Sequence, residues 1–579
     1  MTEPSSDGAG LDATRALIAR LVECWAGLPD SGAEALDLLG ALGTCGDVRG
    51  VAAVVPFAAL PDDPDADLPW HVRARNRLTK SVQDRSALFA DLRSTARTAL
   101  TALVQGVRGG DWLVFDEMAR RNTYSSFRSR EHWEALEPPI LDALPDDDGR
   151  RYAWLALLSC HPNGYVREGA FLRLAGEYAA QAYPIALIRA NDWVAAIRVI
   201  AMEAVRETCE RGEHRVVVDN LSLLLRLESC GREPHGALIE DALTDLITGG
   251  VGALHDGLVQ GSVQLRRCII RIADRVAPAS RLKLVEQAAE DEDLLVRMWA
   301  VRSLDGVAVE GPEAVARLRA RFLHDPAGAI RRIAIEHAVR HDVASAWPTL
   351  EACLLDTSGS VRHVARFYLT KAGREIDYAA HYRKALGGPT KRFVAAVSGL
   401  AETGRVEDAD GLEHLLDHSA SKVVRAVLKA LHRLDEEGTR TRRVEAILHA
   451  SANVRREALR TLGRRLRDAD AETLCRLVPQ ADNERQVGAL VEAAERLKAW
   501  PRLHTLLVIV HRVGEDCRSS ALVALADWRP TDDVLYSASP PTREQTADIK
   551  AAFLAARTIL TLPVRVALER AIGRFVAVE

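Results

Sequence analysis

The chain has 579 residues, too many for one compact core, so either several domains or an array of repeats is expected. Hydrophobic residues make up 48% of it and charged residues 27%, but aromatic residues only 5%. Ala, Leu and Val must therefore fill the core, which favours close-packed helices over β-sandwiches. The formal net charge of −5 excludes a strongly basic protein, so the chain as a whole gives no sign of nucleic-acid or membrane binding.

The sequence carries no feature of secretion or membrane insertion. Residues 1–10 are polar and are expected to be a disordered N-terminus, and apolar stretches such as Val51–Leu60 are too short to span a bilayer. The nine cysteines are scattered, odd in number and free of C-x-x-C pairs, which indicates reduced thiols and no zinc site. We therefore expect a cytoplasmic protein without a cofactor. The rarity of Lys beside Arg is typical of GC-rich bacterial coding.

After the N-terminal residues 1–10, three parts follow in chain order. Residues 11–150 are helical by composition but irregular in spacing, and are expected to be degenerate repeats or a cap, with an acidic, proline-broken loop at 61–69. Residues 151–530 are expected to form regular helical repeats. A loop at 537–545 precedes a last helical pair, so that 531–579 are expected to be C-terminal capping helices.

One short pattern recurs through the regular part. It is a turn residue, four further positions, Val or Ile followed by Arg, and a small apolar residue three places on. Clear examples start at Asp192, Asp291, Asp325, Asp356 and His449. The key arginines are spaced 30–34 residues apart, at 167, 198, 232, 266, 297, 331, 362, 392, 425, 455, 485 and 518. This interval holds two helices and two turns, and the Asp or Ser before each Val-Arg is a helix-starting residue.

The pattern resembles the start of the second helix of HEAT repeats, particularly the short bacterial variety also found in phycobilin lyases. The resemblance covers roughly residues 155–530. It implies an all-α fold, a right-handed α-solenoid of about 12–15 helix pairs whose second helices line the concave face. It also implies an Asp–Arg ladder between adjacent repeats, here expected at Asp192, Arg198, Asp291, Arg297, Asp325, Arg331, Asp356 and Arg362. The ladder should be partial, because His161, Gln260, Ser419 and His449 stand where other repeats have Asp. We expect the repeat arginines to be structural.

The best candidate for a partner surface is the arginine-rich segment 440–467. On its second helix Arg456, Arg460 and Arg464 are spaced by four residues and are expected to share one face, with Arg467 close by. A solvated face is the plainer interpretation. An acidic protein or a nucleic acid is the functional one, although no aromatic residue interrupts the row, which disfavours single-strand binding.

Catalytic signals are weak. Two H-x-x-x-H pairs, His337/His341 and His414/His418, have the spacing of metal ligands on a helix, but neither has the internal Glu of a zincin. Phosphate-binding loops and nucleophile elbows are missing from the sequence. The sequence therefore favours a non-catalytic protein-binding scaffold. A nucleic-acid-binding solenoid that uses 440–467 is the first alternative, and a HEAT-like lyase or metalloenzyme the second.

Overall fold

The structure is a computed structural model that describes residues 6–26, 31–60, 80–120, 133–341, 343–387, 390–528 and 541–572. All regular structure in these ranges is helical, which confirms the expected all-α class. The chain divides into two compact units, Met1–Arg319 and Ala320–Glu579, and the boundary falls inside α19 (Pro312–Phe322), within the range expected to be one regular domain. None of the described helices is long and apolar enough to cross a membrane.

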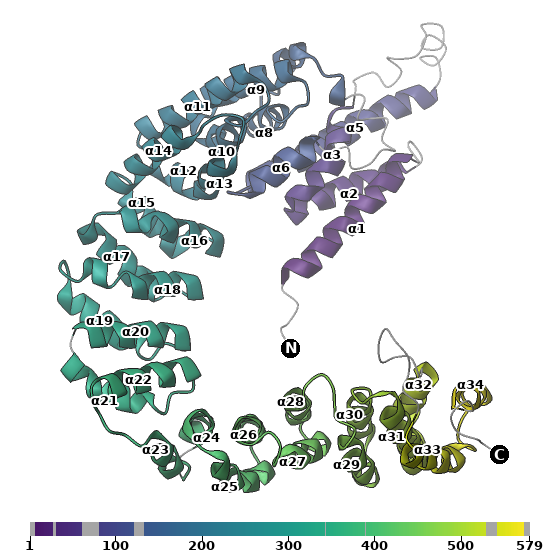
Figure 1. Cartoon of the computed structure of the whole chain (residues 1–579). Helices are drawn as coiled ribbons and strands as arrows, with labels where there is room; N and C mark the ends of the chain where they lie inside the picture. Colours follow the sequence, from purple (N-terminus) through teal and green to yellow (C-terminus); the bar gives the residue numbers. More distant parts are fainter. Residues whose placement is uncertain are drawn as a thin grey trace. The chain divides into compact units, whose positions relative to one another are not determined.

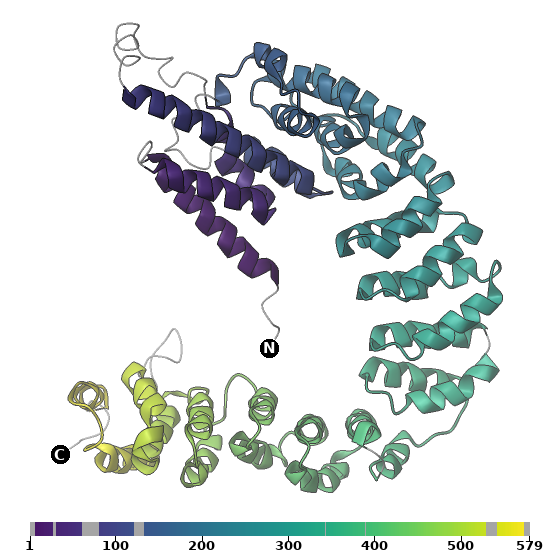
Figure 2. The ribbon, with the colours of Figure 1, turned by 180° about the vertical axis from the view of Figure 1, so that it is seen from behind.

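Unit 1 begins with an irregular helical bundle and continues with helix pairs (Figure 1). Its helices before α19 are α1 (Ser6–Ala26), α2 (Gly32–Cys45), α3 (Val51–Ala58), α5 (Lys80–Gly106), α6 (Asp111–Arg120), α8 (Asp148–Leu158), α9 (Gly164–Glu177), α10 (Ala179–Arg189), α11 (Ala195–Glu210), α12 (His214–Asp219), α13 (Leu221–Arg226), α14 (Gly236–Thr248), α15 (Val251–Gln260), α16 (Val263–Ile272), α17 (Pro278–Ala289) and α18 (Leu294–Arg302). Helix α5 packs on α2, α3 and α8, and so forms the long central helix of the bundle (Figure 2).

The N-terminus differs from expectation in one respect. Residues 6–10, expected to be disordered, form the first turns of α1; no proline interrupts the helix between them and the apolar residues that follow, although Gly8 and Gly10 disfavour it. Residues 1–5 and the acidic loop at 61–69 lie outside the described residues.

The regular stacking of unit 1 is interrupted around α12 and α13. Asn220, with φ −112° and ψ 16°, separates the two short helices, and its side chain donates to the Val216 carbonyl at 2.9 Å. Helix α10 packs on both α12 and α13, which in turn contact α15 and α16, while α11 packs on α14. A repeat whose first helix is broken in this way leaves the neighbouring turns further apart, and a large cavity lies there.

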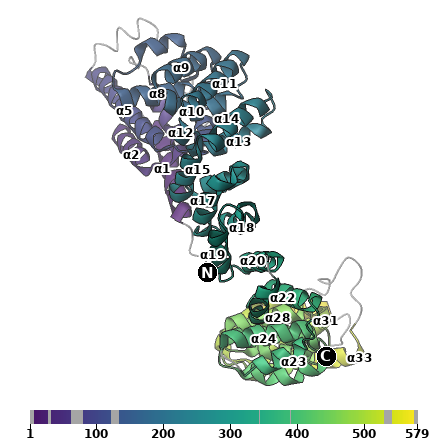
Figure 3. The ribbon, with the colours of Figure 1, turned by 90° about the vertical axis from the view of Figure 1, so that its left-hand side faces the viewer.

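Unit 2 is more regular. It contains α20 (Gly328–His341), α21 (Val343–Cys353), α22 (Gly359–Lys371), α23 (Tyr378–Ala385), α24 (Thr390–Thr403), α25 (Asp410–Glu413), α26 (Ser421–Leu434), α27 (Arg440–Glu445), α28 (Ala452–Leu462), α29 (Asp470–Leu477), α30 (Glu484–Ala494), α31 (Ala499–Arg512), α32 (Ser519–Asp527), α33 (Arg543–Ala556) and α34 (Leu562–Ile572). Helices α24, α26, α28 and α30 form one layer and α25, α27 and α29 the other (Figure 1). Figure 3 shows this stack from the side.

Helix α26 shows how one helix serves two neighbouring repeats. Val423, Val427 and Leu431, at spacings of four, join the hydrophobic core on one side of the helix. Val424 and Leu428 join the core on the other side. Each such buried side chain contributes about 1.5–3 kcal/mol of transfer free energy. The remaining face of the helix is left for charged residues.

Candidate binding surfaces

The repeat arginines first tie each second helix to the turn before it. Arg167, for example, donates from Nη1 to the His161 carbonyl at 2.7 Å. The same bond to the carbonyl six residues upstream, at 2.6–3.0 Å, is formed by Arg198, Arg297, Arg331, Arg362 and Arg455. A charged donor on a turn carbonyl that no helix satisfies makes a strong hydrogen bond, so this contact fixes the geometry of the pair.

A second set of contacts links neighbouring repeats. Arg167 donates from Nε and Nη2 to both carboxylate oxygens of Asp192, 25 residues later, at 2.9 and 2.8 Å. The same 25-residue pairing recurs at Arg266–Asp291 and Arg331–Asp356. Arg198 and Arg362 reach a glutamate of a later turn instead, Glu233 and Glu402 respectively. The side chains of Asp192, Asp291 and Asp356 are therefore each bound by the arginine of the preceding repeat, while the arginine of the same repeat binds the aspartate's carbonyl.

Each ladder aspartate also closes the turn that leads into its own second helix. One carboxylate oxygen accepts from the backbone N–H two residues later, at 3.0 Å for Asp192 and 2.7 Å for Asp291, Asp325 and Asp356. Helix starts leave such N–H groups without a partner, and a carboxylate there also interacts favourably with the helix dipole. At Asp192, Asp291 and Asp356 one side chain thus accepts both from the arginine of the preceding repeat and from the N–H at the start of its own second helix.

Where histidine replaces aspartate, it accepts the hydrogen bond from the N–H two residues later but does not bind the arginine of the preceding repeat. Nδ1 of His161 accepts from the Asn163 N–H at 3.0 Å, and Nδ1 of His449 from the Ser451 N–H at 2.9 Å. Burial lowers the pKa of both imidazoles, which favours the neutral form that can accept this bond. A neutral imidazole cannot bind the arginine of the preceding repeat, so the ladder is interrupted there.

Arg425 is the repeat arginine that precedes His449, so it has no ladder aspartate to bind. Among the described residues it forms no hydrogen bond, and its Nε is buried without a partner. Its guanidinium lies 3.6 Å from Glu457 on the next second helix. The repeat arginines Arg392 and Arg485 are exposed and also form no hydrogen bond with described residues. At these three positions the structure departs from the expectation that every repeat arginine is structural.

The expected row of arginines on the second helix is shorter than predicted. Helix α28 ends at Leu462 because Gly463 adopts φ 88°, a left-handed conformation that glycine tolerates. Arg456 and Arg460 share a helical face, but Arg464 lies beyond the helix, so the predicted i, i+4, i+8 row is wrong at its third member. Arg467 is held by Glu437 in an ion pair, with one bond at 2.7 Å.

Two other arginines of segment 440–467 are structural. Arg440 forms two hydrogen bonds with Asp470, at 2.8 and 2.6 Å, and so links α27 to α29. Arg443 is fully buried, where it donates to the Thr461 carbonyl at 2.9 Å and to the Glu436 carbonyl. Neither is available to a partner.

The exposed basic side chains of α26 and α28 form a cationic surface, which we call the basic face. It consists of Lys422, Arg425, Lys429, Arg433, Arg456 and Arg460. Three of them converge on Glu457, whose side chain is only 5% exposed: Arg460 at 2.5 Å, Lys429 at 3.3 Å and Arg425 at 3.6 Å. Lys422, Arg433 and Arg456 form no ion pair with described residues. Three of the six cations therefore share one carboxylate, and the other three are not neutralised by an ion pair with described residues.

A hollow of about 340 Å³ lies within the basic face. Lys429, His432, Arg433, Arg460 and Thr461 line it. Burial and the nearby Arg443 lower the pKa of His432, so this imidazole adds no charge near neutral pH. The hollow can hold an anionic side chain between the two helices, with the Thr461 hydroxyl beside it.

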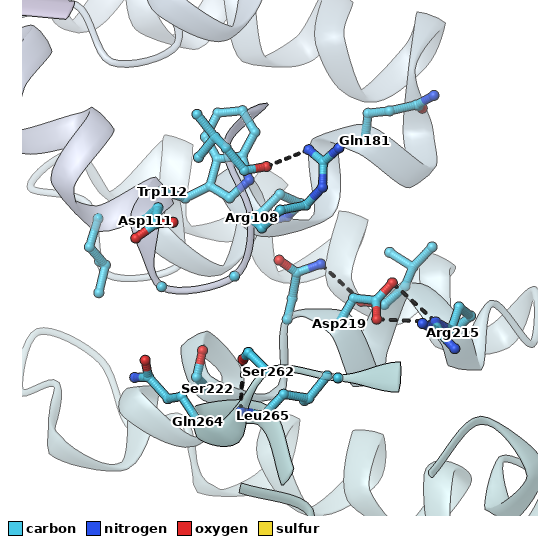
Figure 4. Close-up of a pocket in the computed structure, with 18 of the residues that line it drawn as sticks. Arg108, Asp111, Trp112, Gln181, Arg215, Asp219, Ser222, Ser262, Gln264 and Leu265 are labelled. Carbon is cyan, nitrogen blue, oxygen red and sulfur yellow. Dashed lines mark hydrogen bonds and ion pairs between the residues drawn. The ribbon is translucent and has the colours of Figure 1, made fainter. Parts of the chain in front are cut away.

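A cavity of about 1200 Å³ in unit 1 lies beside the broken α12–α13 segment (Figure 4). The α5–α6 turn at Gly109–Gly110, the start of α10, and the α15–α16 turn surround it. Its charges are balanced locally, since Arg215 pairs with Asp219 at 3.1 Å. Its other polar groups are mainly amides and hydroxyls, namely Gln105, Gln181, Asn220, Ser222, Gln260, Ser262 and Gln264. Such groups both donate and accept, and therefore suit a polypeptide backbone better than an ion.

The two predicted histidine pairs lie in different surroundings. His337 and His341 share α20, with ring centroids 4.3 Å apart. His414 and His418 do not share a helix, because His414 starts a 3₁₀ turn and His418 follows it, where His418 Nδ1 accepts from the Ala420 N–H at 2.9 Å. The second pair therefore lacks the helical geometry that its spacing suggests.

Comparison with known proteins adds one family match. Residues 253–340 match the family model of HEAT repeats. Two solved structures of importin beta resemble the chain. One, in a polyethylene glycol condition, has 11% identity and a TM-score of 0.27, covering 99% of this chain and 86% of that one. The other, in an ammonium sulfate condition, has 12% identity and a TM-score of 0.24, covering 96% and 84%. No curated protein matches the chain. Residues 253–340 are therefore similar to HEAT repeats, and consecutive helix pairs of the same kind make up much of the rest of the described, all-α chain.

Proposed function

We propose that the chain is a non-catalytic protein-binding scaffold whose basic face holds an acidic segment of a partner protein. The observation that supports this is the surplus of positive charge on the basic face, where six cations lie on two adjacent helices and three of them share the carboxylate of Glu457. Like charges this close raise the free energy of the unbound protein, and an anionic partner relieves that repulsion.

A protein segment fits the basic face better than a nucleic acid. The face is confined to two neighbouring helices, and its described residues include no aromatic side chain on which bases could stack. The hollow of about 340 Å³ suits a single carboxylate side chain. Glu457 itself shows that a carboxylate can be bound there by Lys429 and Arg460.

The test is charge reversal at positions that hold no structural contact. Arg433→Glu combined with Arg456→Glu should weaken binding of an aspartate- and glutamate-rich 20-residue peptide by about 10-fold or more at low salt, equivalent to about 1.4 kcal/mol. The matched control is Arg302→Glu with Arg543→Glu, which makes the same charge change at two exposed arginines elsewhere. Calorimetry with the full chain gives the affinities.

Three outcomes would contradict the proposal. Equal weakening by the control pair would show that net charge alone acts. Tighter binding of DNA of the same charge, with a steeper salt dependence, would support the nucleic-acid alternative. A chromophore or stoichiometric metal in the purified protein would support an enzyme, including one of the phycobilin lyase kind.

A further inference from the structure

A second hollow, about 470 Å³ in volume, lies in unit 1 where α6 faces the turn between α10 and α11. Leu113 of α6, Ile188 at the end of α10 and Trp193 in the turn provide its apolar surface. Arg226, at the end of α13, and Arg232 complete the rim. These residues come from four separate segments, and all of them lie within unit 1.

Trp193 is 74% exposed, an unusual state for the largest apolar side chain. One face of its indole is covered by the Arg232 guanidinium, 3.7 Å from the ring centroid. Arg232 is held in place by Asn191, to which its N–H and Nη1 donate at 3.3 and 3.0 Å. An aromatic ring in a fixed orientation beside a fixed arginine is the composition of an interface hot spot.

The carboxylates beneath the hollow are already engaged. Asp192 accepts from Arg167 and from Arg189, the latter at 2.8 Å. Asp116 accepts from Arg120 at 2.9 Å and from Arg189. Three guanidiniums thus bind two carboxylates in a nearly buried cluster, so that neither Asp116 nor Asp192 is open to a further cation.

Arg226 and Arg232 remain without a carboxylate. No ion pair of either residue exists within the described ranges, and the contacts of Arg232 are to a carbonyl, an amide oxygen and an aromatic ring. Two guanidiniums therefore line the same hollow as the exposed indole of Trp193 and the apolar side chains of Leu113 and Ile188. A ligand that matches this must carry one negative charge and an apolar group next to it.

We propose that this hollow binds a peptide segment in which a Glu or Asp stands next to a Leu-like residue. The carboxylate lies between Arg226 and Arg232, and the apolar side chain packs on the Trp193 ring and Leu113. A monoanion fits better than a phosphate dianion because Glu117 also lines the hollow and repels additional negative charge. This site lies in a different unit from the basic face and does not depend on it.

The experiment uses the full chain and labelled acetylated peptides of sequence Gly-Leu-Xaa-Leu-Gly, with fluorescence anisotropy as the readout. We expect the Glu peptide to bind about 10-fold more tightly than the Gln peptide. Arg226→Gln should abolish that difference, and Trp193→Ala should weaken both peptides. Both side chains are exposed, so neither change should unfold the protein.

The controls are Arg302→Gln, an exposed arginine without an ion pair among the described residues, and Tyr165→Ala, an aromatic residue that is 78% exposed at the start of α9. Neither should alter binding. The proposal is overturned if the Gln peptide binds equally well, if the controls act like the test variants, or if a phosphoserine peptide or single-stranded DNA binds more tightly. Because Arg433 and Arg456 are in unit 2, their reversal should leave this binding unchanged, so the two proposals fail separately.

Discussion

Replacing His449 by Asp should restore the missing rung of the ladder. In the existing rungs an aspartate binds the arginine 25 residues upstream and closes the turn before its own helix. His449 provides only the turn contact, and Arg425, the arginine upstream of it, forms no hydrogen bond with described residues. His449→Asp keeps an acceptor for the Ser451 N–H and adds a carboxylate for Arg425.

The magnitude follows from the rung between Arg331 and Asp356, whose side chains are 11% and 13% exposed. Hydrogen bonds between charged groups contribute about 1.5–3 kcal/mol. Desolvation and the ordering of Arg425 offset part of this. The carboxylate at a helix start adds about 0.5 kcal/mol. We therefore expect a net stabilisation of about 1–2 kcal/mol.

A double-mutant cycle measured by native-state hydrogen exchange isolates the rung. His449→Asp is made in the wild-type chain and in Arg425→Gln, and the opening free energy of the α28 amides is compared. We expect a coupling of about 1–2 kcal/mol, and about threefold weaker binding of the acidic peptide because Arg425 leaves the basic face. Equal stabilisation in both backgrounds would refute the reasoning.

Four further predictions concern single positions. Asp192→Asn should cost about 3–5 kcal/mol in urea unfolding, because it leaves the buried Arg167 guanidinium without a carboxylate and removes one of the two that bind Arg189. Burial lowers the pKa of His161 in the folded state, so the unfolded chain binds the proton more readily. The free energy of unfolding should therefore fall as the pH drops below about 6.5, and it should fall less in His161→Gln. Burial raises the pKa of the Cys160 thiol well above its usual value, so a thiol reagent at about pH 8 should leave Cys160 unlabelled until the protein unfolds. Gly463→Ala should destabilise α28 by about 1–2 kcal/mol, measured by hydrogen exchange, because φ is 88° there.

Much of the fold could be predicted because the contacts that define one repeat are made by residues close together in the sequence. The turn aspartate, the arginine six residues later and the four-residue apolar spacing each reflect a contact within one helix pair. The 25-residue rungs could also have been found, by pairing each arginine with the next aspartate. Arg464 was misplaced because a helical spacing was continued through Gly463.

The candidate site was harder to predict, because residues of one type at one repeat position have different roles. Arg331 and Arg425 cannot be told apart by their own neighbours; they differ in whether Asp or His stands about 25 residues later. The exposure of Trp193 depends on the break at Asn220 and on α6, which are distant in sequence. Interactions of this kind depend on tertiary packing, and periodicity does not report them.

The missing rung has a mechanical consequence. Around α26 and α28 the repeats are tied on the first-helix side by Arg440–Asp470, while the second-helix side lacks the Arg425 rung. The ion pairs of Arg425 and Lys429 with Glu457 on that side are longer, at 3.6 and 3.3 Å, and a stack held more tightly along one side bends most easily about that side. The surface that carries the surplus charge is thus also the one that can spread or close around a ligand at the least elastic cost.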